Sequence, residues 1–102
     1  MRFLVLGYDG SGEKALERRM AVREDHLAGS RQMYASGRWL YSGAILDDEG
    51  TMIGSFVVCD FASREELEER WLRDEPYVAG GVWERIEIHP VHVSPRAPSE
   101  RR

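Results

Sequence analysis

Three basic side chains near the N-terminal end of the chain have the types and the spacing to do chemistry. Arg19, Arg23 and His26 are spaced i, i+4 and i+7, so they share one face if the segment is helical. The unperturbed pKa of an imidazole lies near neutrality, which makes His26 a candidate acid or base. Three potential cations in a row also require an anion opposite them, and a substrate in a pocket would supply one.

The same row has a purely structural interpretation. Charged rows are common on protein surfaces, where each ion pair adds little stability. Nearby acids could balance the row in solution, namely Glu17, Glu24 and Asp25. Spacing alone favours this solvated face, so a catalytic role for His26 depends on what the fold places opposite it.

A carboxylate for His26 could come from the segment Asp74-Glu75-Pro76-Tyr77. A proline disfavours helical conformation in the residue before it, so these acids are held out of a helix. A carboxylate beside an imidazole orients its tautomer and raises its pKa, as in an acid–base dyad. The alternative is a polar turn, which the segment favours when taken alone. Ser55, after Gly54, is either a pocket residue or an ordinary strand serine.

Counts of residues exclude other kinds of site. Cys59 is the single cysteine, so an intrachain disulfide and a multi-cysteine zinc site are excluded, and its apolar neighbours predict a buried thiol. The net charge is −4, which argues against nucleic acid as a partner. No apolar run approaches the roughly 20 residues of a membrane span. The N-terminal segment lacks the features of a signal peptide, so we expect a cytoplasmic protein.

Patterning predicts the elements that position these residues. We expect strands over 2–8, 38–46, 51–61 and 83–93, and helices over 13–36 and 63–72. Residues 74–81 are expected to form a loop or a short turn. The order βαββαβ indicates an α+β, ferredoxin-like fold with sheet order 4-1-3-2 and both helices on one face.

Local signals refine the two helices. Ser11 or Gly12 could cap the first helix, and Ser63 with Glu66 forms a capping box at the start of the second. One apolar stripe on the first helix is expected to face the sheet, comprising Leu16, Met20, Leu27 and Tyr34. On the second helix the inward residues are expected to be Leu67 and Trp71.

The two central strands are apolar on both faces, although both helices cover only one face. A large apolar patch is unfavourable in a monomer, and two-fold dimers are the commonest oligomers. We therefore predict a homodimer with two sheets face to face, built from one domain over residues 1–93. Residues 94–102 are rich in proline and arginine and are expected to be a disordered tail.

Four motifs in this order resemble the YCII-related (YciI-like) family. The motifs are Leu16–Leu27 with its arginines ahead of a histidine, Gly37–Gly43, Gly54-Ser55, and Glu75–Val82. The resemblance extends from Arg2 to about Val93. It implies a dimeric α+β barrel, which agrees with the sheet argument.

The resemblance also implies a pocket in which a His–Asp pair is the acid–base apparatus. The histidine corresponds to His26. The family commonly has Asp directly before the proline, whereas this chain has Glu75 there and Asp74 one residue earlier. Position favours Glu75 and residue type favours Asp74. Ser55 and Tyr77 are expected to contact the substrate in the same pocket.

The chemistry that the resemblance implies is proton transfer or lyase-type work on small, often hydroxylated aromatic compounds, including dehydrochlorination. The leading hypothesis is an acid–base enzyme (lyase, isomerase or dehydrochlorinase) with no metal or organic cofactor. His26 moves the proton, and Arg19 or Arg23 holds an anionic or enolate oxygen. The alternative is a non-catalytic dimer that binds a small ligand as a regulatory module. A third hypothesis, a haem enzyme with His26 as axial ligand, requires a coloured protein.

Overall fold

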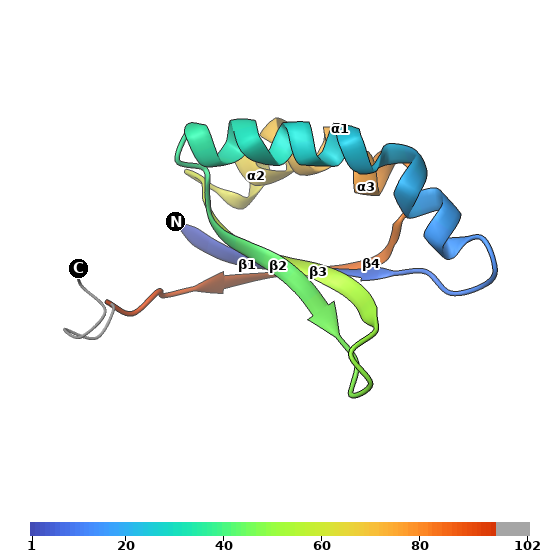
Figure 1. The fold of residues 1–102 in the computed structure, drawn as a ribbon. Helices are drawn as coiled ribbons and strands as arrows, with labels where there is room; N and C mark the ends of the chain where they lie inside the picture. The colour runs from blue at the N-terminus through green and yellow to red at the C-terminus, as the bar shows by residue number, and fades with distance from the viewer. Residues whose placement is uncertain (96–102) are drawn as a thin grey trace.

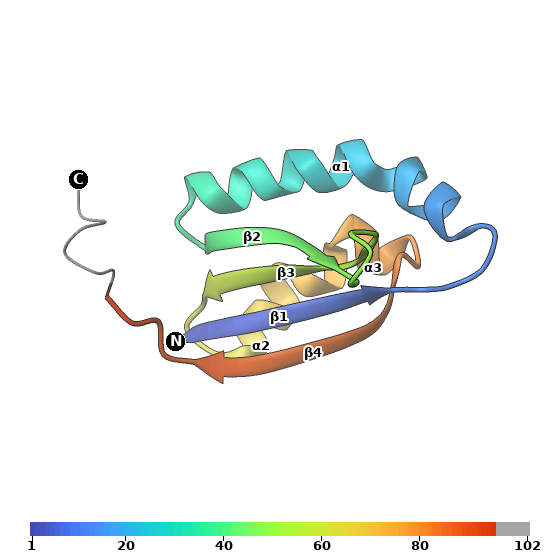
Figure 2. The same cartoon turned by 60° about the horizontal axis from the view of Figure 1, so that its bottom comes forward.

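All the helices lie on one face of a four-stranded antiparallel sheet, in a computed structural model that describes residues 1–95 (Figure 1). The strands are β1 (Arg2–Asp9), β2 (Trp39–Leu46), β3 (Met52–Asp60) and β4 (Trp83–Val91). The helices are α1 (Ala15–Ala35), α2 (Arg64–Arg70) and α3 (Pro76–Ala79), with a 3-10 turn at Leu72–Asp74. The strand order β2-β3-β1-β4 (Figure 2) confirms the predicted ferredoxin-like arrangement, with β1 and β3 central.

The core lies between the sheet and the helices. The register pairs Phe3 with Cys59 and Val5 with Val57, and all four side chains are buried on the helix-covered face. Burying an apolar side chain of this size contributes about 1.5–3 kcal/mol. Aromatic side chains from several elements complete the core, namely Trp39, Phe61, Trp71, Tyr77 and Trp83.

The start of α2 follows its prediction closely. The hydroxyl of Ser63 accepts the backbone N–H of Glu66 at 3.1 Å. The Glu66 carboxylate accepts the N–H of Ala62 at 3.0 Å, one residue earlier than a capping box requires. Leu67 and Trp71 are buried as expected.

Two other local predictions were wrong. α1 begins at Ala15 with Lys14 at its N-cap and no side-chain cap, so neither Ser11 nor Gly12 has that role. Residues 76–79 form a four-residue helix where a loop or a short turn was expected, because proline suits the first helical position and Glu75 caps the helix. Of the predicted disordered tail, Ser94 and Pro95 have no regular secondary structure, and residues 96–102 lie outside the described residues.

The face that α1 turns to the sheet mixes polar and apolar side chains, which corrects the predicted apolar stripe. Leu27 lines the cavity as expected, and Val22 and Met33 pack against the core. Leu16, Met20 and Tyr34 are exposed, whereas Arg19 is only 7% exposed. Amphipathic patterning assumes that the inner face of a helix packs against apolar neighbours. Here the middle of α1 borders a cavity, and its inward charges meet carboxylates. Arg19 and His26 therefore do not lie on the solvated face that their spacing favoured.

The second face of the sheet carries no helix among residues 1–95 (Figure 1). We call it the open face. The register and the alternation of burial place these apolar side chains on it: Leu4, Leu6, Tyr8, Tyr41, Ile45, Phe56 and Val58. The face is a continuous surface across β2, β3 and β1, and the predicted dimer requires such a surface.

The pairing of β1 with β3 depends on a glycine. A Cβ atom at Gly54 would lie 2.3 Å from the carbonyl oxygen of Gly7, so Gly54→Ala should cost about 1–3 kcal/mol through overpacking. Gly29 in α1 has open space around it, so Gly29→Ala should stabilise by about 1 kcal/mol through helix propensity. Urea unfolding measures both changes. An unchanged free energy of unfolding for Gly54→Ala would contradict the close approach of these strands.

Candidate active site

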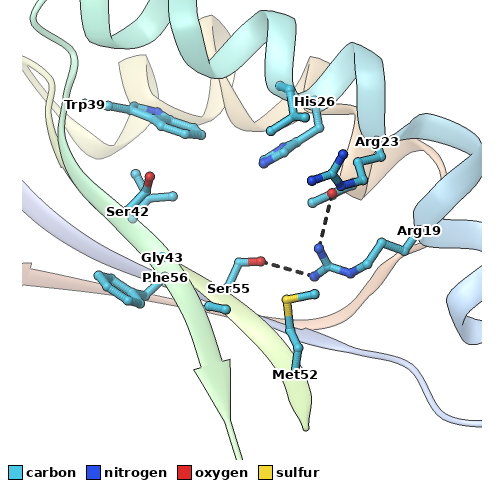
Figure 3. Close-up of a pocket in the computed structure, with 13 residues that line it drawn as sticks. Arg19, Arg23, His26, Trp39, Ser42, Gly43, Met52, Ser55 and Phe56 are labelled. Carbon is cyan, nitrogen blue, oxygen red and sulfur yellow. Dashed lines mark hydrogen bonds between the residues drawn. The ribbon is translucent and has the colours of Figure 1, made fainter. Parts of the chain in front are cut away.

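A cavity of about 330 Å³ lies between α1 and the helix-covered side of β2 and β3 (Figure 3). The α1 side is lined by Arg19, Arg23, His26 and Leu27, and the sheet side includes Ser42, Ala44, Ser55 and Val57. The buried Trp39 and Tyr77 also border it. The cavity therefore combines apolar walls with a few convergent polar groups, as small-molecule sites commonly do.

His26 contacts the carboxylate of Glu75. The distance from His26 Nδ1 to Glu75 Oε1 is 2.5 Å, and the side chains are 13% and 3% exposed. Because a carboxylate oxygen accepts, Nδ1 carries the donated proton. In a neutral ring the other nitrogen, Nε2, is then the acceptor. The imidazole points into the cavity (Figure 3), so that acceptor can meet a bound molecule.

Three donors fix the carboxylate of Glu75. Besides His26, the indole Nε1 of Trp71 donates to Oε2 at 2.8 Å, and the backbone N–H of Tyr77 donates to Oε1 at 3.2 Å. Glu75 thus caps α3 and contacts His26 with one group. Trp71 and Tyr77 are themselves buried, so the orientation of the carboxylate is set by packed neighbours.

Asp74 lies elsewhere. Its side chain is 80% exposed, and its nearest cation is Arg73 at 3.9 Å. The backbone turns between the 3-10 turn and α3, which sends Asp74 to solvent and Glu75 inward. Of the two acids that the sequence left open, the structure brings Glu75 to His26.

Arg19 is held by a carboxylate that the sequence did not predict. Its Nε and Nη2 donate to Asp9 Oδ2 and Oδ1 at 2.9 and 3.1 Å. Burial alone would lower the pKa of Arg19, but the hydrogen bond and the charge of Asp9 outweigh it and raise that pKa above its ordinary value. In the sequence Asp9 begins the turn Asp9-Gly10-Ser11-Gly12, and no local signal pairs it with Arg19.

Arg19 also joins two hydroxyl groups at the cavity. Its Nη1 donates to the hydroxyl oxygen of Tyr77 at 3.2 Å, and its Nη2 donates to Ser55 Oγ at 3.3 Å (Figure 3). The Tyr77 ring stacks on the His26 ring, with centroids 3.8 Å apart and planes 10° from parallel. Burial raises the pKa of Tyr77 despite the nearby cation, so its hydroxyl keeps its proton.

Arg23 has a different environment from Arg19. It is exposed, and its guanidinium lies at the edge of the cavity (Figure 3). Among residues 1–95, no carboxylate forms an ion pair with it. Of the two arginines predicted to hold an anion, Arg23 is therefore the one whose charge is available to a ligand.

Other features of the described residues complete the survey. Cys59 is buried on β3, and burial raises the pKa of its thiol to about 12, so it is not a nucleophile. Within residues 1–95, no three His, Cys, Asp or Glu side chains are grouped so as to hold a metal ion. No helix in that range has both the length and the apolar composition to cross a membrane.

Comparison with known proteins gives consistent matches. The model of the YCII-related domain matches residues 1–92. An uncharacterised protein of Haemophilus influenzae is 36% identical over 81 residues, which cover 74% of this chain and 82% of the relative. Protein YciI of Escherichia coli is 35% identical over 82 residues, which cover 74% of this chain and 83% of the relative.

A solved structure shares the fold. The 5-chloro-2-hydroxyhydroquinone dehydrochlorinase of Burkholderia phenoliruptrix, in complex with 2,5-dihydroxybenzoquinone, superposes with a TM-score of 0.78. The superposition covers 92% of this chain and 96% of that chain, at 22% identity. At this identity the similarity establishes the fold.

The different environments of the adjacent acids predict different costs of substitution. Glu75→Gln leaves buried donors mismatched and should cost about 1–3 kcal/mol of unfolding free energy. Asp74→Asn changes an exposed group and should stay within about 0.5 kcal/mol of wild type. Urea unfolding at neutral pH compares them. Equal costs, or a larger cost for Asp74→Asn, would contradict the assignment of Glu75 as the buried partner.

Proposed function

The chain belongs to the YCII-related family, and we propose that it is a small-molecule enzyme working by general acid–base chemistry with His26 as the proton-transfer group. The match over residues 1–92 confirms the resemblance that the sequence motifs indicated. One observation carries the proposal. His26 Nδ1 lies 2.5 Å from a buried carboxylate, while the ring lines a cavity.

In this proposal Nε2 of His26 takes a proton from the substrate. In an isomerisation it returns a proton to another atom of the substrate, and in a dehydrochlorination chloride leaves with the electron pair of the C–Cl bond and the proton passes to solvent. Glu75 holds the tautomer in which Nε2 is the acceptor, and its carboxylate stabilises the imidazolium that forms. A positioned base of this kind contributes roughly 10²–10⁴-fold to a rate. Trp71 and the N–H of Tyr77 keep the carboxylate in place during the transfer.

The cavity supports a small, hydroxylated aromatic substrate. Leu27, Ala44 and Met52 line it with apolar atoms, and Arg23 offers a cation at the edge. The neighbour of the same fold is a dehydrochlorinase that is bound to a dihydroxybenzoquinone. We therefore infer proton-transfer or lyase-type chemistry, dehydrochlorination included, on compounds of this class. Arg23 would attract the anionic group, and Arg19 would position neighbouring side chains.

We further propose that the active form is a homodimer joined through the open face. Packed sheets lie about 10 Å apart face to face, so a second copy would cover the apolar side chains of β1 and β3. Phe56 lies near the middle of this face, with its ring against Gly43 of β2. A two-fold axis makes the same patch serve both partners.

Turnover tests the catalytic proposal. Chlorinated hydroxyhydroquinones and hydroxyquinones are offered to the purified chain, and absorbance and chloride release are followed. His26→Asn should lower kcat by about 10²–10⁴-fold, because the base is lost. Ser36→Ala, at the exposed end of α1, should leave kcat unchanged.

Two outcomes would contradict the proposal that the chain is an enzyme with His26 as its base. The first is turnover that survives His26→Asn, because another group then moves the proton. The second is tight binding of these compounds with no turnover, which would identify the chain as a non-catalytic binding module with the same cavity.

The dimer has its own test. Sedimentation equilibrium should give the mass of two chains for the wild type, whereas Phe56→Asp should give the mass of one chain, because it buries a charge in the interface. Leu16→Asp, on the exposed side of α1, is the matched control and should remain dimeric. A monomeric wild type would contradict the face-to-face dimer.

A further inference from the structure

We propose that Ser55 and Tyr77 form a two-hydroxyl oxyanion site, set in place by the buried Arg19, that stabilises a substrate oxygen as it gains negative charge. The inference rests on the proposed acid–base function and assigns the other half of that reaction. His26 would remove the proton, and the two hydroxyl groups would receive the charge that this removal creates.

The hydrogen bonds around Arg19 leave both hydroxyl protons free. Tyr77 and Ser55 each accept a hydrogen bond from a terminal nitrogen of the same guanidinium, at 3.2 and 3.3 Å. Neither hydroxyl has an acceptor for its own proton among residues 1–95. Both residues line the cavity, so a bound oxygen is the acceptor that these two donors lack.

Arg19 is unsuited to contact the substrate anion itself. All three of its side-chain nitrogens already donate within the protein, Nε and Nη2 to Asp9, and Nη1 and Nη2 to Tyr77 and Ser55. Asp9 also neutralises the charge of the guanidinium. A hydroxyl group that accepts a hydrogen bond from a cation becomes a stronger donor. Arg19 therefore strengthens the hydrogen bonds that Ser55 and Tyr77 can donate to a molecule in the cavity. Arg19 and Asp9 are thus positioning residues.

Direct contacts join the base to Tyr77, one of the two proposed donors. The Tyr77 ring stacks on His26 at 3.8 Å, and the Tyr77 N–H donates to the carboxylate that holds His26. Preorganised donors of this kind act without reorganisation when charge develops, and losing one costs about 10²–10³ in kcat.

Proton removal by His26 with charge developing on an oxygen between Ser55 and Tyr77 restricts the substrate to one chemical class. His26 Nε2 takes a proton from a carbon or hydroxyl group conjugated with a carbonyl group. The electron pair of the broken bond moves through the conjugated system, and the carbonyl oxygen becomes an enolate or phenolate oxygen that accepts from Ser55 and Tyr77. Proton return to another atom of the same system restores His26. The substrate is therefore an enolisable carbonyl compound or a hydroxylated quinone.

Binding of 4-nitrophenol tests the site without any turnover, because its anion mimics the charged oxygen and absorbs visible light. The wild type should prefer the ionised form. Tyr77→Phe and Ser55→Ala should each weaken binding of the anion about tenfold, the loss typical of one hydrogen bond to a charged group. Binding of 4-nitroanisole, which has no ionisable oxygen, should not change. The control Ser36→Ala, at the exposed end of α1 and outside the cavity lining, should bind the anion like wild type.

Several outcomes would overturn the oxyanion site. The first is wild-type affinity for the 4-nitrophenol anion in both Tyr77→Phe and Ser55→Ala. The second is a loss of the preference for the ionised form in Arg23→Gln alone, which would place the anion at the cavity edge. Equal losses for 4-nitroanisole would indicate a damaged cavity. Ser55→Ala removes one hydroxyl group from a half-buried residue, so it decides the question if Tyr77→Phe does not fold.

The same assay separates this inference from the proposed function. Preference for the anion that depends on Ser55 and Tyr77, together with an absence of His26-dependent turnover, would support the site and refute the enzyme. Turnover that depends on His26, with no contribution from the two hydroxyl groups to binding of the anion, would support the enzyme and refute the oxyanion site.

Discussion

A buried guanidinium is tolerated only where an opposite charge and hydrogen-bond acceptors surround it, and the arrangement of this site depends on how Arg19 meets that requirement. Asp9 at the end of β1 supplies the charge, and Tyr77 and Ser55 supply further acceptors. These contacts join α1 to β1, β3 and α3. They also place Tyr77 against His26, so the ion pair orders the residues that we propose as acid–base and oxyanion groups.

The fold was largely predictable because its signals are local. The central strands are apolar on both faces, and the start of α2 has a side-chain cap that the sequence displays. The inner face of α1 was not predictable in this way. A cavity with paired charges allows Arg19 inside, beside the apolar Val22 and Met33, and leaves Leu16 and Met20 exposed, so the inner face is only partly apolar. The four-residue α3 is too short for periodicity to reveal.

Only those parts of the site that have a local signal in the sequence were predictable. His26 and the acidic segment stand out by residue type, but the choice between Glu75 and Asp74 depends on a turn of the backbone that neither residue encodes. Asp9 is far from Ser55 and Tyr77 in the sequence, and only the assembled sheet brings their side chains to one guanidinium. Catalysis and dimerisation stay predictions, because each depends on a molecule beyond the single chain.

The central claim is that Glu75 fixes His26 with its proton on Nδ1 and leaves Nε2 free toward the cavity. Two-dimensional NMR that correlates the ring nitrogens and carbon-bound protons of His26 reports this tautomer directly, at a pH where the ring is neutral. We predict a protonated Nδ1 and an unprotonated Nε2 in the wild type, and loss of that preference in Glu75→Gln. A wild-type ring with its proton on Nε2 would contradict the account, because Nε2 could not then act as the base.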